Sequence, residues 1–168
     1  DGIGKDIVNA ATSIVDLSSD IIGGYKCNWD LINAGATYFA LTGKDVEPGG
    51  EEKADKSDSI FLGAIGLPTI RHTDGTEICP HLRFREVFNL YAGVRPVKAY
   101  PNITNRLSNE LSSKIDLVIL RESTEGLFYS AAVHNRCPVD NNEEVQDIMR
   151  ITRTTTEKLH DFAFNLAR

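Results

Sequence analysis

The stretch LRFREVFNLYAGVRPVKAYP, residues 82–101, decides the fold of this chain. Its apolar spacing predicts a helix over 82–91, which Gly93 should end, and then a strand over 94–100. Because proline has no amide hydrogen to donate to a neighbouring strand, Pro96 indicates that this strand lies at a sheet edge or contains a bend. A helix followed at once by a strand favours a fold in which both kinds of element share a core.

Helices and strands alternate on both sides of this stretch as well. The expected helices are 5–19, 34–41 and 155–167, the further strands are 25–32, 59–65 and 115–120, and 48–58 is expected to be a polar surface passage. This alternation predicts the α/β class, with a sheet flanked by helices. No strand precedes the first loop, and the last helix has no C-cap, so we expect a fragment of a larger fold.

Three arginines stand at the ends of these elements: Arg85, Arg95 and Arg121. A guanidinium group matches a carboxylate with two parallel hydrogen bonds, so several that converge from separate elements form a site for carboxylates. Most arginines instead form ion pairs on the protein surface, and this explanation is sufficient for any one of the three. The three together favour a carboxylate-binding site.

Two loops follow predicted strands, where ligands gather in open α/β sheets. Arg121–Gly126, RESTEG, brings charged side chains to the end of one strand, and ordinary capping of that strand explains it equally well. Gly63–Pro68, GAIGLP, is a turn of small residues that lets a ligand approach the backbone, although a plain turn is the simpler explanation. Neither this turn nor DGIG at 1–4 contains the three glycines of the dinucleotide fingerprint.

Composition excludes several classes of function. The chain has 18 basic and 24 acidic side chains, a net charge of −6 and no basic cluster, so no nucleic acid partner is expected. No apolar run approaches the roughly 20 residues that span a membrane, and no signal peptide opens the chain, so no membrane partner is expected either. Three widely spaced cysteines, Cys27, Cys79 and Cys137, indicate a reducing compartment: the cytoplasm or, in a eukaryote, the mitochondrial matrix. The four histidines lack metal-ligand spacing, and we expect no metal ligands in this chain.

Several of these segments together resemble the metal-dependent β-decarboxylating dehydrogenases, the family of isocitrate, isopropylmalate, tartrate and D-malate dehydrogenases. The resembling segments are the opening loop Asp1–Lys5, the first cofactor loop Phe61–Pro68, and the substrate motifs Leu82–Pro101 and Leu117–Gly126. The resemblance covers the whole chain and is most specific over 59–126. It implies the N-terminal half of a two-domain isopropylmalate-dehydrogenase-like fold with a mixed sheet.

The resemblance also implies how the parts of the chain are used. Residues 1–93 would belong to the first, cofactor-side domain, and 94–168 would begin the second domain, which binds substrate and dimerises. The segment 131–142, expected to be a projecting hairpin, resembles the arm that joins two subunits, so the complete enzyme is expected to be a homodimer.

The implied chemistry is the oxidation of a 2-hydroxy dicarboxylic acid, followed by loss of the carboxylate β to the new ketone. The three arginines would bind the carboxylates, NAD or NADP would take the hydride, and Mg²⁺ or Mn²⁺ would polarise the carbonyl. Ile3, Ala64 and Ile65 would lie along the cofactor. The family's metal-binding aspartates and catalytic lysine lie beyond the point that matches Arg168, so the chain alone is expected to be inactive.

The positions that set substrate choice in the family are occupied here by Cys79, His81 and Leu82. This combination matches neither the isocitrate enzymes, which have small polar groups at the first two positions, nor the isopropylmalate enzymes, which have apolar groups at the last two. His81 could contact a polar group on a smaller acid such as malate or tartrate. An ordinary loop histidine is the alternative.

The family places a tyrosine, acting as proton donor, where this chain has Phe128, and Tyr129 follows it. On a strand, a shift of one residue turns a side chain to the opposite face, so Tyr129 could serve as the acid only if a local bulge turned it back. Aromatic core packing is the alternative for both rings. A second hypothesis for the chain as a whole is a non-catalytic regulatory or assembly half that binds a carboxylate ligand or a partner chain without turnover.

Overall fold

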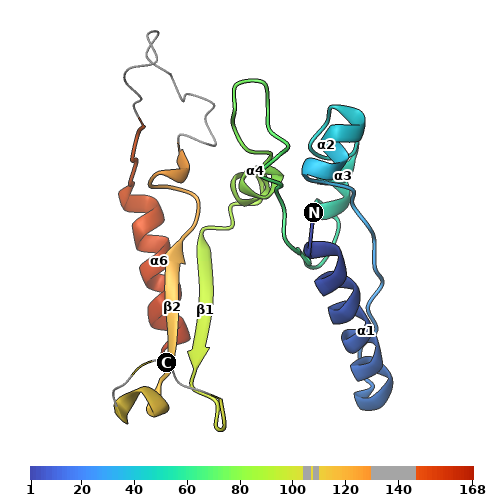
Figure 1. The fold of residues 1–168 in the computed structure, drawn as a ribbon. Helices are drawn as coiled ribbons and strands as arrows, with labels where there is room; N and C mark the ends of the chain where they lie inside the picture. Colours follow the sequence, from blue (N-terminus) through green and yellow to red (C-terminus); the bar gives the residue numbers. More distant parts are fainter. Residues whose placement is uncertain (104–106, 108–109, 130–146) are drawn as a thin grey trace. The chain divides into compact units, whose positions relative to one another are not determined.

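The computed structural model describes residues 1–103, 107, 110–129 and 147–168, and the chain divides into two units, Asp1–Phe84 and Arg85–Arg168. Figure 1 shows the helices and strands of each unit. The assignment of 1–93 to a cofactor-side domain and of 94–168 to a substrate and dimerisation domain stays a prediction. The hairpin expected at 131–142 lies outside the described residues.

The first unit contains helices α1 (Gly4–Ile22), α2 (Ala36–Thr42) and α3 (Gly50–Asp55). Gly23 ends α1 with φ 71°, and Gly43 ends α2 with φ 73°. Glycine adopts these positive φ values without the steric cost that a side chain would bring, which is why it so often follows the last turn of a helix. The two helices predicted at 5–19 and 34–41 are therefore confirmed.

The strands predicted at 25–32 and 59–65 are wrong, because neither segment forms a strand in the structure. A strand needs a neighbour that supplies a ladder of hydrogen bonds, whereas apolar and aromatic composition supplies only a tendency. Trp29 and Phe61 do contact each other, with ring centroids 6.0 Å apart. Phe61 is nevertheless 51% exposed, so the second segment is not a buried strand.

The passage at 48–58, expected to be only a polar surface, contains helix α3. Gly50 and Ala54 are buried on one side of it, and a Cβ at Gly50 would lie 2.7 Å from Cγ1 of Val46. Small residues four apart share one face of a helix, and here they allow close packing. The polar surface is confirmed, since Glu52, Asp55 and Lys56 are exposed, and the spacing of the small residues accounts for the additional helix.

The buried apolar side chains within the described ranges all belong to the first unit: Ala36, Val46, Ala54, Ile78 and Phe84. Helices α2, α3 and α4 (Pro80–Val87) each contribute one of them. The core therefore lies among these short helices rather than against α1, whose Ile14 and Leu17 are exposed.

Helix α4 ends earlier than the expected helix at 82–91, and a residue other than Gly93 ends it. Asn89 adopts φ 49°, and the amide of Leu90 donates to the carbonyl of Arg85 at 2.7 Å. Asparagine tolerates the left-handed region better than most residues, so it can take the role usually played by glycine. Gly93 instead lies within the following strand.

The second unit contains strands β1 (Ala92–Lys98) and β2 (Asp116–Glu122), which pair antiparallel, with the 3₁₀ helix η1 (Glu110–Lys114) between them. The strands predicted at 94–100 and 115–120 are confirmed, with bounds shifted by about two residues. Among the described residues the sheet has only these two strands. The α/β class is also confirmed, because the described residues form helices and a small antiparallel sheet.

Helix α6 (Arg153–Leu166) lies beside β2 in Figure 1 and confirms the helix predicted at 155–167. The hydroxyl of Thr152 caps its N-terminus by accepting a hydrogen bond from the amide of Thr155. None of the helices in the described ranges is both long enough and apolar enough to cross a membrane.

Candidate functional site

The strand register brings Arg95 and Arg121 to one face of the sheet. Gly93 pairs with Arg121, and Arg95 pairs with Ile119. Residues directly opposite each other point to the same side, and so do residues two apart along one strand. Arg95 and Arg121 are therefore diagonal neighbours, and Gly93 contributes no side chain between them.

Arg85 belongs to the same group of charges, although it comes from helix α4. Partial burial, and then the positive charges of Arg121 and Arg95, lower the pKa of Arg85. This direction means that the cations lie close enough to repel one another. Because a guanidinium group stays protonated near neutral pH, the result is a concentrated positive charge and not a neutral side chain. Arg85, Arg95 and Arg121 are called the arginine cluster below.

No carboxylate neutralises the arginine cluster within the described residues. The buried Nε of Arg121 also lacks a hydrogen-bond partner there. Arg83, two residues before Arg85, shows the ordinary arrangement, with ion pairs to Asp45 at 3.0 Å and to Glu51 at 2.6 Å. Like charges gathered without counter-charges are costly unless an anion joins them, so the cluster has the character of an anion-binding site.

The ring of Phe128 lies against two members of the cluster. The Cζ atoms of Arg85 and Arg121 each lie 5.5 Å from the centre of that ring. Both distances are within the range in which the electron-rich face of an aromatic ring attracts a cation. The sequence suggests only core packing or a replaced tyrosine for Phe128, and no local pattern indicates this contact.

Tyr129 has a different neighbour. The Cζ of Arg150 lies 4.8 Å from the centre of its ring, and Arg150 also pairs with Gly126 through an isolated antiparallel bridge. Phe128 and Tyr129 are helical and do not lie on a strand, so the strand assumed at this point, with its bulge, is wrong. Phe128, and not Tyr129, has its ring against Arg85 and Arg121. The proton-donor role of Tyr129 stays a prediction.

The two glutamates of the RESTEG loop organise the turn after β2. The Glu122 carboxylate accepts from the Thr124 amide at 2.7 Å, from the Thr124 hydroxyl at 2.6 Å and from the Glu125 amide at 2.6 Å. These contacts use the carboxylate of Glu122 inside the loop, as the capping explanation expected.

Glu125 connects this loop to the start of α6. Its carboxylate accepts from the amide and the hydroxyl of Thr152, both at 2.7 Å, and from the hydroxyl of Thr155 at 3.0 Å. Burial raises the pKa of Glu125, but these hydrogen bonds outweigh it, and the net result is a lowered pKa. The loop that carries Phe128 and Tyr129 is thus held at both of its glutamates, a link that no local sequence signal indicated.

The residues expected along the cofactor lie in the first unit. Ile3 is 67% exposed at the start of α1, and Ala64 is exposed as well. A Cβ at Gly4 would lie 2.5 Å from the Ala64 carbonyl oxygen, so α1 begins in direct contact with the backbone of this turn. Ile65 follows and is half-buried. Exposed small and apolar groups beside a closely packed turn fit the flat surface of a nucleotide.

The Asp1 carboxylate holds this turn against helix α2. It accepts hydrogen bonds from the amides of Ala36 at 2.7 Å, Thr37 at 2.9 Å and Gly66 at 2.8 Å. Two of these donors are free amides of the first turn of α2, which a carboxylate satisfies well.

The three positions expected to set selectivity lie around the start of α4. His81 and Leu82 are in its first turn, Cys79 directly precedes it, and all three are half-buried. The Leu82 amide donates to the Cys79 carbonyl at 3.0 Å, and the Cys79 thiol lies 3.9 Å from the Glu77 carboxylate. Their role in selectivity stays a prediction.

No three His, Cys, Asp or Glu side chains of the described residues are grouped so that they could hold a metal ion.

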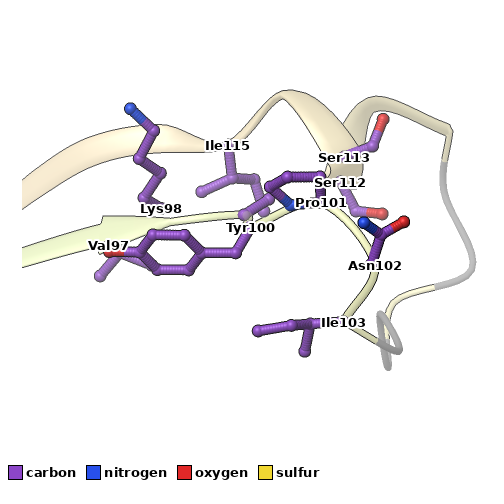
Figure 2. Close-up of a pocket in the computed structure, with 10 residues that line it drawn as sticks. Val97, Lys98, Tyr100, Pro101, Asn102, Ile103, Ser112, Ser113 and Ile115 are labelled. Atoms are coloured by element: carbon purple, nitrogen blue, oxygen red, sulfur yellow. The ribbon is translucent and has the colours of Figure 1, made fainter.

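A pocket of about 540 Å³ lies at the far end of β1 and is drawn in Figure 2. It is lined by Val97–Ile103, Ser112, Ser113 and Ile115. No member of the arginine cluster lines it. The pocket is therefore separate from the predicted substrate residues.

Comparison with known proteins places these features in one family. The sequence matches the isocitrate/isopropylmalate dehydrogenase family over residues 1–168. 3-Isopropylmalate dehydrogenase from Heyndrickxia coagulans is 32% identical, covering 100% of this chain and 46% of the relative. A probable tartrate dehydrogenase/decarboxylase from Agrobacterium vitis is 30% identical with the same coverage. The solved isocitrate dehydrogenase from Methylococcus capsulatus aligns with a TM-score of 0.77 and 26% identity, covering 100% of this chain and 45% of that structure.

The chain belongs to the isocitrate/isopropylmalate dehydrogenase family, as its motifs predicted. It spans about half the length of the curated relatives that it matches. Those relatives are named for different acids, so their names do not select one substrate for this chain.

Proposed function

We propose that the complete protein oxidises and decarboxylates a small 2-hydroxy dicarboxylic acid, and that this chain supplies the groups that bind its carboxylates. The observation that carries the proposal is the arginine cluster, three neighbouring guanidinium groups without a carboxylate partner among the described residues. Family membership supports the reaction class, because the relatives are named dehydrogenases and decarboxylases.

The cluster suits an acid with two carboxylates. Arg95 of β1 and Arg121 of β2 project from one sheet face, and Arg85 belongs to α4, so their hydrogen-bond donors come from three different elements. Each charge-assisted contact to a carboxylate contributes roughly 1.5–3 kcal/mol to binding. Burial is the main cause of the lowered pKa of Arg85, and repulsion by Arg121 and Arg95 adds to it; a dianion would relieve that repulsion. A monocarboxylic acid would leave part of this charge unbalanced.

The proposed cofactor is NAD or NADP. The exposed side chains of Ile3 and Ala64, together with Ile65 in the packed turn, would lie along it. When bound, the nicotinamide accepts the hydride from the carbon that carries the hydroxyl group. The part played by this chain is to hold the acid by its carboxylates so that this carbon has a fixed orientation.

The family also implies Mg²⁺ or Mn²⁺. The described residues offer no group of three ligands for such an ion. We further propose that Cys79, His81 and Leu82 discriminate among acids. The complete enzyme would be a homodimer. It would work in a reducing compartment, such as the cytoplasm or the mitochondrial matrix.

The test is an assay of the full-length protein with D-malate, tartrate, isocitrate and isopropylmalate, each with NAD or NADP and with Mg²⁺ or Mn²⁺. We expect reduced cofactor and CO₂ from at least one acid, and strong loss of both with Arg121→Ala. Absence of turnover with every combination, together with dicarboxylate binding, would instead support a non-catalytic carboxylate-binding half.

The 168-residue chain should be assayed in parallel. We expect no turnover from it, because the resemblance places the catalytic lysine and the metal-binding aspartates outside it. Turnover by this chain alone would show that it supplies those groups itself.

A further inference from the structure

We infer that Phe128 is a positioning residue, which holds Arg85 and Arg121 in place for the carboxylates by presenting its ring to both guanidinium groups. The inference rests on the proposed role of the arginine cluster, and it deepens that role by naming what keeps the cluster together before an acid binds.

The centre of the Phe128 ring is equally distant from both guanidinium groups. The Cζ atoms of Arg85 and Arg121 each lie 5.5 Å from the centre of the Phe128 ring. A cation within about 6 Å of a ring centre is attracted by the negative face of the π system. One ring that attracts two cations offsets part of the repulsion between them, and no carboxylate among the described residues does this.

An aromatic ring suits this position better than a carboxylate would. A glutamate or aspartate between the two arginines would neutralise them and occupy the donors that a substrate needs. A ring contributes attraction without accepting a hydrogen bond, so the N–H groups of both arginines stay available. The Nε of Arg121 is buried and has no hydrogen-bond partner among the described residues, so its N–H group is available as a donor.

The segment that leads to Phe128 is itself held in place. Gly126 adopts φ 69° and exchanges two backbone hydrogen bonds with Arg150, at 2.7 and 3.3 Å. Glu125 is bound to the start of α6 through Thr152 and Thr155. Because the backbone is held two and three residues before the ring, Phe128 can act as a fixed platform and not merely follow the arginines.

Phe39 of α2 supplies a matched control, since the same Phe→Leu change can be made there. Its ring packs edge-on against His72, with ring centroids 4.9 Å apart, and no role in the proposed site is assigned to it. Only the removal of the Phe128 ring should affect Arg85 and Arg121.

The experiment compares Phe128→Leu, Phe128→Trp and Phe39→Leu in the full-length protein. Leucine keeps an apolar side chain and removes the π face, whereas tryptophan keeps the π face. The dissociation constant of D-malate, measured by calorimetry, should rise about 5- to 30-fold in Phe128→Leu, the size expected for two cation–π contacts. Phe128→Trp should return to within about threefold of wild type, and Phe39→Leu should stay near wild type.

Thermal unfolding and Arg121→Ala separate the outcomes. If Arg121→Ala weakens D-malate binding but Phe128→Leu does not, the positioning role is wrong and the proposed function stands. If Arg121→Ala also leaves binding unchanged, the arginine cluster is not the carboxylate site, and both proposals fail. A fall in melting temperature in Phe128→Leu and Phe128→Trp alike, with no recovery of affinity in the latter, would show that Phe128 only fills space.

Discussion

Gly93 lies directly opposite Arg121 across the β1–β2 ladder. A Cβ at Gly93 would lie 2.8 Å from the Ser123 hydroxyl oxygen and 3.8 Å from Cβ of Arg121. Any side chain at this position would point to the face that carries Arg95 and Arg121. The glycine therefore keeps open the space beside the arginine that the carboxylate is expected to reach.

We predict that Gly93→Ala lowers both stability and dicarboxylate affinity. The first effect arises because the new methyl group is too close to the Ser123 hydroxyl, and overpacking of this kind costs typically about 1–3 kcal/mol. Denaturant unfolding and calorimetric titration with D-malate measure the two effects. In the double variant Gly93→Ala, Ser123→Ala the stability should recover while the affinity stays low. Full recovery of both would show that Gly93 matters only for packing.

Arg121→Lys should reduce kcat/KM of the full-length enzyme by a factor equivalent to a loss of about 1.5–3 kcal/mol in transition-state stabilisation, because a point charge cannot replace the guanidinium fork. Arg95→Ala should cost a similar amount. Lys98→Ala is the matched control on β1, since Lys98 is an exposed cation already paired with Asp116 at 3.2 Å. The measurement is kcat/KM with each acid. Wild-type efficiency in both arginine variants would exclude these residues from the substrate site.

His81→Leu should change the preference among acids and leave the arginine cluster intact. A neutral imidazole offers one donor and one acceptor to a polar substituent, and leucine offers neither. We expect the ratio of kcat/KM for malate or tartrate to that for isopropylmalate to fall by a factor equivalent to about 1–3 kcal/mol, the size of one pocket contact. If the ratio is unchanged, His81 is an ordinary residue of α4 and selectivity lies elsewhere.

The ionisation of Glu125 should make the stability of the folded chain depend on pH in the acidic range. Although burial opposes its ionisation, hydrogen bonds from Thr152 and Thr155 lower its pKa in the folded state below the ordinary value of 4.5. Its stabilising effect is therefore present above that ordinary value and is lost as the pH falls through the lower, folded pKa. Glu125→Gln should weaken the loop–α6 link by about 1–2 kcal/mol near neutral pH and flatten this acid dependence. Equal acid dependence in wild type and variant would contradict the assignment.

Helices and strands whose signals lie within a few neighbouring residues could be predicted without the structure. The helical periodicity of α1 and α6 and the apolar runs of β1 and β2 were sufficient to predict all four. The sequence also identified the three arginines and the family, because these depend on residue identity at fixed spacing. The antiparallel register of β1 and β2 then places Arg95 and Arg121 on one face of the sheet.

Only the tertiary structure decided which side chains meet. Whether 25–32 and 59–65 become strands depends on a hydrogen-bonding neighbour, and composition cannot supply one. The contact of Phe128 with Arg85 and Arg121 joins three separate elements of the chain, and the choice of Phe128 over Tyr129 is set by the turn after β2. Periodicity acts over a few neighbouring residues, whereas these contacts depend on how distant segments pack, and that is why the structure was needed to see them.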